Sequence, residues 1–184
     1  MMSDWEQDAD RVRQKAHYEP LKILVWGPGD PGAAGSEPAK KAYAKRQQMK
    51  AVLQREFPCA EVHFSEDAEM IRLSEGIGGQ LRKEALQART ADLILMLDIG
   101  RGVDLELDHF IPAYSWFPPK VHVFLPIEHV STKGLVREIL DYLKPHQIEG
   151  FTADEYDKCI VASEKVVRPT LNVALDHLLQ RFAK

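Results

Sequence analysis

One stretch of the chain limits its possible folds more than any other. The segment Ala91–Leu97 ends in five consecutive apolar residues and passes directly into Asp98 and a glycine-containing turn, after which acidic residues recur where a helix is expected. A short apolar run bounded in this way is typical of a strand buried on both faces of a parallel sheet. We therefore expect these acidic side chains at the carboxyl end of the sheet, the edge where open α/β sheets bind ligands.

Alternation of strand and helix extends over most of the chain. Strands are predicted at Leu21–Trp26, Glu61–Phe64, Ala91–Leu97, Lys120–Pro126 and, more weakly, Ile148–Phe151. Helices are predicted from the N-cap Ser36 to about Phe57, at Leu81–Thr90, Val103–Tyr114 and Gly134–Leu143, and from Thr152 or Asp154 onward, with Pro169 kinking or dividing the last. Crossovers of this length join parallel strands. The expected fold is a flavodoxin-like or Rossmann-like three-layer α/β/α sandwich with four or five parallel strands.

The length and composition are typical of one soluble domain. The chain has 184 residues, of which 45% are hydrophobic and 28% charged, enough for a single hydrophobic core. Residues 1–20 are polar and are interpreted as an arm or a short helix. Because no linker, repeat or low-complexity segment divides the remainder, residues 21–184 are expected to form one α/β domain.

Charge and hydropathy argue against several classes of partner. The net charge of -4, without a long basic run, disfavours nucleic acid. No apolar run approaches the roughly 18 residues of a membrane helix, and the charged N-terminal segment lacks the apolar centre of a signal peptide. The two cysteines and the scattered histidines have no metal-ligand spacing. We expect a cytoplasmic protein with no metal site and no membrane partner.

The loop after the first predicted strand is rich in glycine. It opens with Gly27, Pro28 and Gly29 and extends to Ser36. The spacing G-x-G-x-x-G is formally present, but prolines interrupt it, and the next strand does not end in the acidic residue expected about 20 residues on. Two interpretations remain open. The loop is either a ligand-binding loop whose N–H groups approach a phosphate or sugar, or a long surface turn.

Acidic residues follow the second and third predicted strands. Glu66, Asp67 and Glu69 come after the second, where carboxylates can accept two hydrogen bonds from the vicinal hydroxyls of a ribose, although such runs are also common in solvated loops. Glu106 flanks the apolar face of the helix predicted after the third strand. A partly buried carboxylate beside a cleft is suited to nucleophilic or ion-pair chemistry.

These motifs together resemble those of the nucleoside 2-deoxyribosyltransferase-like superfamily and, more distantly, of TIR-type domains that cleave NAD. The similarity covers residues 21–126. The matching residues are the turn Trp26-Gly27-Pro28, the acidic segment Phe64-Ser65-Glu66-Asp67, and the phrase that runs from Ala91-Asp92 through Asp98 and Gly102 to Glu106-Leu107.

The resemblance implies a function and a set of site residues. Glu106 corresponds to the nucleophile that takes the sugar at C1′, and Asp98 to a residue that helps to bind the nucleoside. Trp26 is expected to stack on the base, with core packing as its other interpretation, and Arg101 to meet a phosphate or to lie in an exposed turn. The expected catalytic residues are Glu106 and Asp98, and the expected substrate-binding residues are Trp26, Gly27, Pro28, Gly29, Asp67, Arg101 and Gly102.

The reaction implied is cleavage or transfer of the N-glycosidic bond of a nucleoside, nucleotide or NAD-like molecule, without a cofactor. A homo-oligomer is also implied, because many members of the superfamily complete their sites across a subunit contact. Two alternatives from other classes remain open on the sequence. One is a nucleotide-binding sensor or adaptor that uses the same cleft without turnover, and the other is a flavodoxin-like interaction domain.

Overall fold

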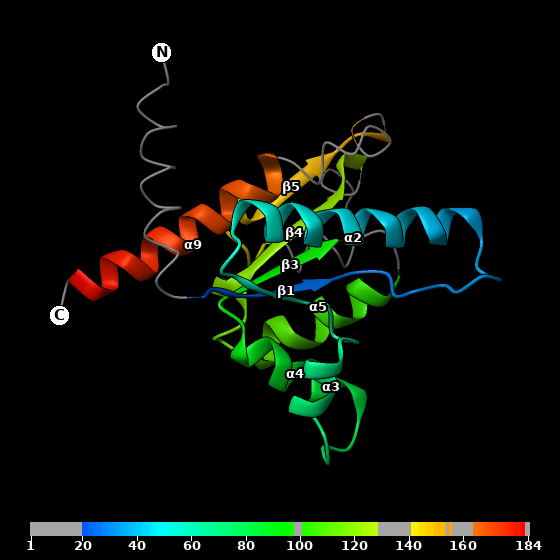
Figure 1. Ribbon diagram of the computed structural model, residues 1–184, viewed down its shortest axis with the longest axis horizontal. Helices are drawn as coiled ribbons and strands as arrows, with labels where there is room; N and C mark the ends of the chain where they lie inside the picture. The colour runs from blue at the N-terminus through cyan, green and yellow to red at the C-terminus, as the bar shows by residue number, and fades with distance from the viewer. Residues whose placement is uncertain (1–19, 98–100, 129–140, 154, 156–163, 183–184) are drawn as a thin grey trace.

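A single parallel sheet forms the centre of the molecule. The computed structural model describes residues 20–97, 101–128, 141–153, 155 and 164–182, and for 101–106, 164 and 177–182 it describes the backbone alone. The strands are β1 (Lys22–Trp26), β2 (Glu61–His63), β3 (Leu93–Leu97), β4 (Val121–Pro126) and β5 (Ile148–Phe151). They lie in the order β2-β1-β3-β4-β5, and every pairing is parallel (Figure 1). The flavodoxin-like topology expected from the sequence is confirmed, including the weak fifth strand.

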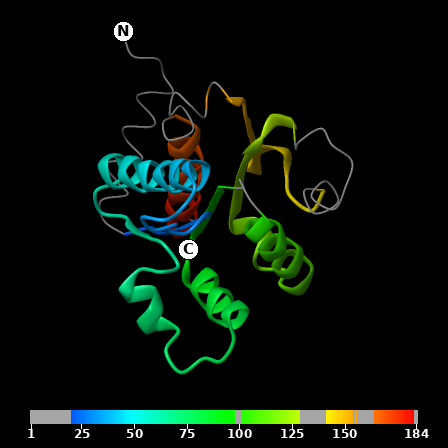
Figure 2. The ribbon, with the colours of Figure 1, turned by 90° about the vertical axis from the view of Figure 1, so that its right-hand side faces the viewer.

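Helices cover both faces of the sheet and complete the three layers. One face carries α2 (Glu37–Glu56) and α9 (Glu164–Phe182), and the other carries α4 (Gln80–Thr90) and α5 (Arg101–Ala113). The short helix α3 (Ala68–Leu73) lies beside α4, as the turned view in Figure 2 also shows. The 3₁₀ turns η1 (Pro118–Lys120) and η2 (Pro145–Gln147) precede β4 and β5. Helix α3 was not predicted, because six residues with two charged side chains carry too little periodicity.

The apolar side chains of the strands divide between two cores with the period of two that strands impose. In β1, Ile23 and Val25 pack toward α2 and α9, whereas Leu24 and Trp26 pack toward α4 and α5. All five residues of β3 are buried because this strand lies at the centre of the sheet. The uninterrupted apolar run in the sequence therefore corresponds to a strand covered on both faces.

The local signals for helix boundaries are largely confirmed. Ser36 caps α2, accepting a hydrogen bond at Oγ from the Ala39 N–H (3.4 Å), and a proline occupies the first turn. Thr152 and Glu155 exchange reciprocal hydrogen bonds of the capping-box type, as expected of a helix start. Pro169 lies within α9 and does not end it. Residues 141–143 form a turn instead of the predicted helix end.

Other expectations concern segments outside the described residues. The arm or helix predicted over residues 1–20 falls there except for its last residue. The helix predicted at Gly134–Leu143 also falls there as far as residue 140. Among the described residues, no helix has both the length and the apolar character needed to cross a bilayer.

Candidate functional site

A cavity of about 520 Å³ opens at the carboxyl edge of the sheet, beside the ends of β1 and β2. Its volume falls within the range of small-molecule sites. The strand order reverses at β1, since the chain leads from β1 to β2 on one side and from β3 to β4 on the other, and the carboxyl ends of strands at such switch points are where α/β folds bind ligands. The lining residues are Trp26, Gly27, Gly29, Asp30, Arg46, Ser65, Glu66, Ile71, Ser74, Gln80, Lys83, Glu84 and Gln87.

The glycine-rich loop enters the cavity wall through a tight approach to β3. Gly27 has φ +153°, and a Cβ at this position would lie 3.2 Å from both Cβ and the carbonyl oxygen of Leu97. A side chain here would therefore be strained and crowded, which explains the glycine. Gly29 lines the cavity, and the carbonyl of Pro28 accepts a hydrogen bond from Arg46. Of the loop residues expected at the site, Gly27 and Gly29 line the cavity and Pro28 borders it through its carbonyl.

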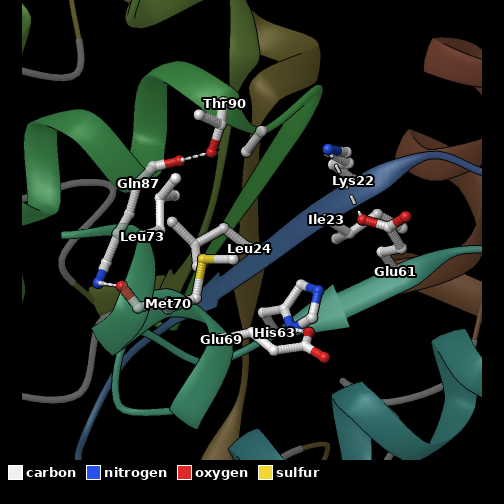
Figure 3. Close-up of a pocket in the computed structure, with 11 residues that line it drawn as sticks. Lys22, Ile23, Leu24, Glu61, His63, Glu69, Met70, Leu73, Gln87 and Thr90 are labelled. Atoms are coloured by element: carbon white, nitrogen blue, oxygen red, sulfur yellow. Dashed lines mark hydrogen bonds and ion pairs between the residues drawn. The ribbon is translucent and has the colours of Figure 1, made fainter. Parts of the chain in front are cut away.

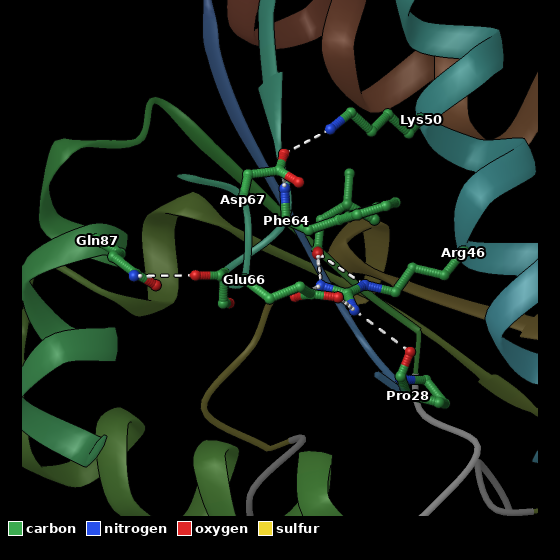
Figure 4. A network of polar contacts seen from close by, with 9 residues as sticks. Pro28, Arg46, Lys50, Phe64, Glu66, Asp67 and Gln87 are labelled. Atoms are coloured by element: carbon green, nitrogen blue, oxygen red, sulfur yellow. Dashed lines mark hydrogen bonds and ion pairs between the residues drawn. The ribbon is translucent and has the colours of Figure 1, made fainter. Parts of the chain in front are cut away.

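Arg46 of α2 connects the chain segments that border this cavity (Figure 4). Its guanidinium donates to both carboxylate oxygens of Glu66, at 2.6 and 2.9 Å, and twice to the Val25 carbonyl at the end of β1, at 3.1 and 2.9 Å. It also lies 4.2 Å from the ring centroid of Phe64, a cation–π distance. A bidentate pair of this kind fixes the orientation of both partners. Glu66, expected to bind a sugar, is therefore bound to Arg46 at the cavity wall.

Sequence reasoning missed Arg46, although a signal for it exists. The buried positions of α2 include Ala42, Arg46, Met49 and Leu53, which recur at helical spacing on one face. An arginine within an apolar stripe needs an internal partner, because a buried charge is costly when unpaired. The spacing thus marks Arg46 as the member of a buried ion pair, but the partner is 20 residues away and only the fold identifies it.

Asp67 is not among the described residues that line the cavity. Its carboxylate accepts hydrogen bonds from Lys50 Nζ (2.5 Å) and from the Phe64 N–H (2.9 Å), and it precedes the first residue of α3. Burial acts to raise the pKa of Asp67, but the hydrogen bonds and the Lys50 charge outweigh burial and hold the pKa below its usual value. The structure assigns Asp67 an internal role, joining β2, α2 and α3.

Trp26 reaches the cavity as a core side chain. It is 2% exposed, and its ring centroid lies 5.5 Å from that of Phe110 and 5.8 Å from that of Phe117. A ring buried in this way has no open face on which a base could stack, so the packing interpretation fits the structure and the stacking interpretation does not. Its Nε1 is buried and has no hydrogen-bond partner among the described residues. The group that Trp26 can offer to a ligand is therefore an N–H donor.

Helix α4 supplies a polar wall of the cavity. The sequence did not reveal this wall. Gln80, Lys83, Glu84 and Gln87 line the cavity at i, i+3, i+4 and i+7 spacing, so one face of the helix is exposed to it. Glu84 and Gln87 are buried. Nothing in the sequence distinguishes these polar residues from those on a solvated helix face.

The segment that follows β3, residues 98–106, is only partly described. Asp98 is outside the described residues, Gly102 is described through its backbone, and the side chains of Arg101 and Glu106 are not described. The backbone places Arg101 and Gly102 as the first two residues of α5 and Glu106 as the sixth, because the helix begins two residues earlier than predicted. The start of α5 follows the carboxyl end of β3, the same edge of the sheet as Gly27.

Asp92, the other acidic residue of the Ala91-Asp92 phrase, lies at the opposite edge of the sheet. Its Oδ2 accepts a hydrogen bond from the backbone N–H of Lys22 (2.8 Å), and its own N–H donates to the Lys22 carbonyl. These contacts extend the pairing of β1 and β3 at their amino ends. The part of the phrase that precedes the strand is therefore structural.

Two smaller cavities lie away from this edge. One of about 220 Å³ lies beside the amino half of β1 and along β2, where His63 Nδ1 is 3.4 Å from a carboxylate oxygen of Glu69 (Figure 3). The other, of about 280 Å³, lies between α9 and the strands β4 and β5, next to the buried His122. Within the described ranges, no three histidine, cysteine or acidic side chains are grouped as metal ligands.

The carboxyl-edge cavity is the candidate site, because it combines the glycine-rich loop, a fixed ion pair and buried polar groups to which the described part of the chain gives no partner. Comparison with known proteins adds no family to this description. No protein-family model matches the chain, and no curated protein matches it significantly.

Proposed function

We propose that this chain cleaves or transfers the N-glycosidic bond of a nucleoside, nucleotide or NAD-like molecule that binds in the carboxyl-edge cavity. The observation that carries the proposal is the cavity itself. It lies beside the carboxyl end of β1, where the strand order reverses, and is lined by a glycine-rich loop and by buried polar groups that have no partner among the described residues. Such a lining is suited to a polar ligand of nucleoside size.

Glu106 is the residue proposed to perform the chemistry. Its carboxylate would attack C1′ of the sugar, the C1′–N bond would break with its electron pair leaving on the base, and the base would take up a proton. Water would then hydrolyse the glycosyl ester, or a second base would accept the sugar. The position of Glu106 early in α5, after the central strand β3, supports this role, since α5 begins at the edge that carries the cavity.

A chromatographic assay for free base tests the proposal. The protein is incubated with ribo- and deoxyribonucleosides, their 5′-monophosphates and NAD, with Glu106→Gln in parallel. Loss of a covalent nucleophile is expected to reduce base release by about a thousandfold or more. Asp108→Asn is the matched control, because Asp108 is an exposed carboxylate on the same helix. Absence of base release from every substrate, or an equally active Glu106→Gln protein, contradicts the proposal.

The second candidate function is a nucleotide-binding sensor or adaptor without turnover. The specific observation in its favour is the state of Glu66, whose two carboxylate oxygens are both bound to Arg46. A carboxylate held in this way shapes a binding cavity and is not available as a nucleophile. For a sensor, nucleotide raises the unfolding temperature of the parent and of Glu106→Gln equally, and no base is released.

A further inference from the structure

Two buried acceptors lie one helical turn apart in the wall of the carboxyl-edge cavity. Glu84 and Gln87 are three residues apart on α4 and are 8% and 4% exposed. Side chains at this spacing are neighbours on the helix surface. The cavity wall therefore carries two buried polar side chains next to each other on one helix.

The amide of Gln87 is held in one orientation. Its Nε2 donates to the backbone carbonyls of Ser65 (3.2 Å) and Met70 (3.0 Å), and the first of these bonds is visible in Figure 4. Because carbonyl oxygens only accept, they must face the amide nitrogen and not the amide oxygen. The oxygen, Oε1, is buried and has no hydrogen-bond partner among the described residues. A buried acceptor in this state needs a donor, and none of the described residues supplies one.

Glu84 has acceptor capacity left over as well. Its Oε1 accepts one hydrogen bond, from Gln80 Nε2 at 2.6 Å, and the structure assigns its Oε2 no donor within the described ranges. An ionised carboxylate can accept about four hydrogen bonds. Because Oε2 is not among the fully buried atoms without a partner, it remains accessible to a donor in the cavity. Glu84 and Gln87 together call for a ligand group with two adjacent donors.

We propose that Glu84 and Gln87 accept hydrogen bonds from the vicinal hydroxyls of a ribose, so that the cavity selects ribosyl over 2′-deoxyribosyl ligands. This inference rests on the proposed function only for the nucleoside nature of the ligand. A cis-diol carries two O–H donors on neighbouring carbons, which matches two acceptors on one helix face. Removal of the 2′-hydroxyl leaves one buried acceptor unpaired, the situation in which polar sites discriminate most strongly.

The acidic residues after β2 are not available for this task. Both oxygens of Glu66 bind Arg46, and Asp67 binds Lys50 and the Phe64 N–H. Asp30, which also lines the cavity, accepts from the Gly32 N–H. Among the described acidic residues that line the cavity, Glu84 is buried, whereas Asp30 and Glu66 are exposed to solvent. The diol is therefore assigned to α4.

Calorimetric titration of the full-length protein tests the assignment. The probes are the common ribonucleosides, their 5′-monophosphates and NAD, compared with the 2′-deoxy and 3′-deoxy counterparts of the nucleosides and monophosphates. We expect the ribo form to bind at least about tenfold more tightly than its 2′-deoxy counterpart, since one buried acceptor is left unpaired. Equal affinity, or binding of none of these compounds, overturns the inference.

A variant of Glu84 tests whether α4 is responsible for the preference for ribosyl ligands. Glu84→Gln keeps the shape of the side chain but removes acceptor capacity, so the ratio of ribo to deoxy affinity is expected to fall toward one. Glu75→Gln, an exposed residue outside the cavity lining, is the control and keeps the ratio of the parent. An unchanged ratio in Glu84→Gln overturns the role of Glu84. If this variant does not fold, the ribo and deoxy affinities of the parent still decide the inference.

Base release is measured on the same compounds and separates the two proposals. Ribose selectivity without base release contradicts N-glycosidic cleavage and leaves the ribose site standing. Base release at equal rates and affinities from ribo and deoxy substrates overturns the ribose site and leaves the cleavage reaction standing.

Discussion

At the scale of single residues, the candidate site depends on polar side chains that face inward. Arg46 connects the end of β1, the glycine-rich loop and the segment after β2 through hydrogen bonds to Val25, Pro28 and Glu66. The guanidinium is buried, whereas the side chain of Glu66 is 44% exposed, so the pair forms the boundary between core and cavity. Lysine cannot reproduce this planar, five-donor geometry.

Arg46→Lys is therefore expected to lower the free energy of unfolding by about 2 kcal/mol, because several hydrogen bonds to a charged group are lost and Val25 and Glu66 lose their donors. Urea unfolding at neutral pH measures the change. Arg55→Lys is the control on the same helix, since Arg55 forms an exposed pair with Glu56 and should change stability by less than about 0.5 kcal/mol. Equal effects of the two substitutions would contradict the role assigned to Arg46.

At the scale of elements, the connection from β2 to α3 is fixed to α2 by Asp67. The carboxylate binds Lys50 from α2 and the backbone N–H of Phe64 immediately after β2. Despite burial, which alone raises a carboxyl pKa, these contacts hold the pKa of Asp67 below its usual value. A carboxyl group whose pKa is lowered by folding stabilises the folded state above its unfolded pKa, and this stabilisation is lost as the pH falls through the folded pKa.

Asp67→Asn is expected to destabilise the protein by about 1 kcal/mol at pH 7, since one charge-assisted hydrogen bond is weakened. The difference between parent and variant should shrink as the pH falls below the ordinary carboxyl value of about 3.9, because the parent then loses the same charge. Urea unfolding at pH 7, 5 and 3 measures this. A difference that stays constant over the series would show that Asp67 contributes through its shape and not its charge.

At the scale of the whole molecule, the packing of α9 on the sheet buries a titratable group. His122 of β4 is 7% exposed, lies beside the cavity under α9, and has an Nε2 without a partner among the described residues. Burial, with a smaller contribution from the nearby His146, lowers the pKa of His122 to about 4. The folded protein therefore holds this imidazole neutral at a pH where the unfolded chain protonates it.

The pH dependence of the unfolding free energy follows from proton linkage at His122. Between pH 6.5 and pH 4 the unfolded state binds more protons than the folded state, so stability falls as the pH falls through this window. His122 alone should account for a loss of about 3 kcal/mol. His122→Gln removes the titration and should flatten the dependence of unfolding free energy on pH. His109→Gln, at an exposed position of α5, is the matched histidine control. A His122→Gln slope equal to that of the parent would contradict this account.

Much of the fold was predictable because its signals are local. The apolar run of β3, the N-cap Ser36 and the short strand Ile148–Phe151 each follow from residues adjacent in the chain. Periods of 2 and 3.6 and the capping preferences are properties of such neighbours. Helix α3 escaped prediction because it is short and stabilised by contacts with distant segments, such as the bond from Gln87 to the Met70 carbonyl.

The sequence by itself determined the alternation of elements, the parallel sheet and the edge at which to look for a site. Only the tertiary structure decided which polar residues the site contains. Glu66 and Asp67 stand side by side in the chain, yet one borders the cavity against Arg46 and the other binds Lys50. Glu84 and Gln87 are ordinary helix residues until α4 packs beside the end of β1. Ion pairing and burial depend on groups that approach through space, so their outcome is set by the fold and not by neighbours in sequence.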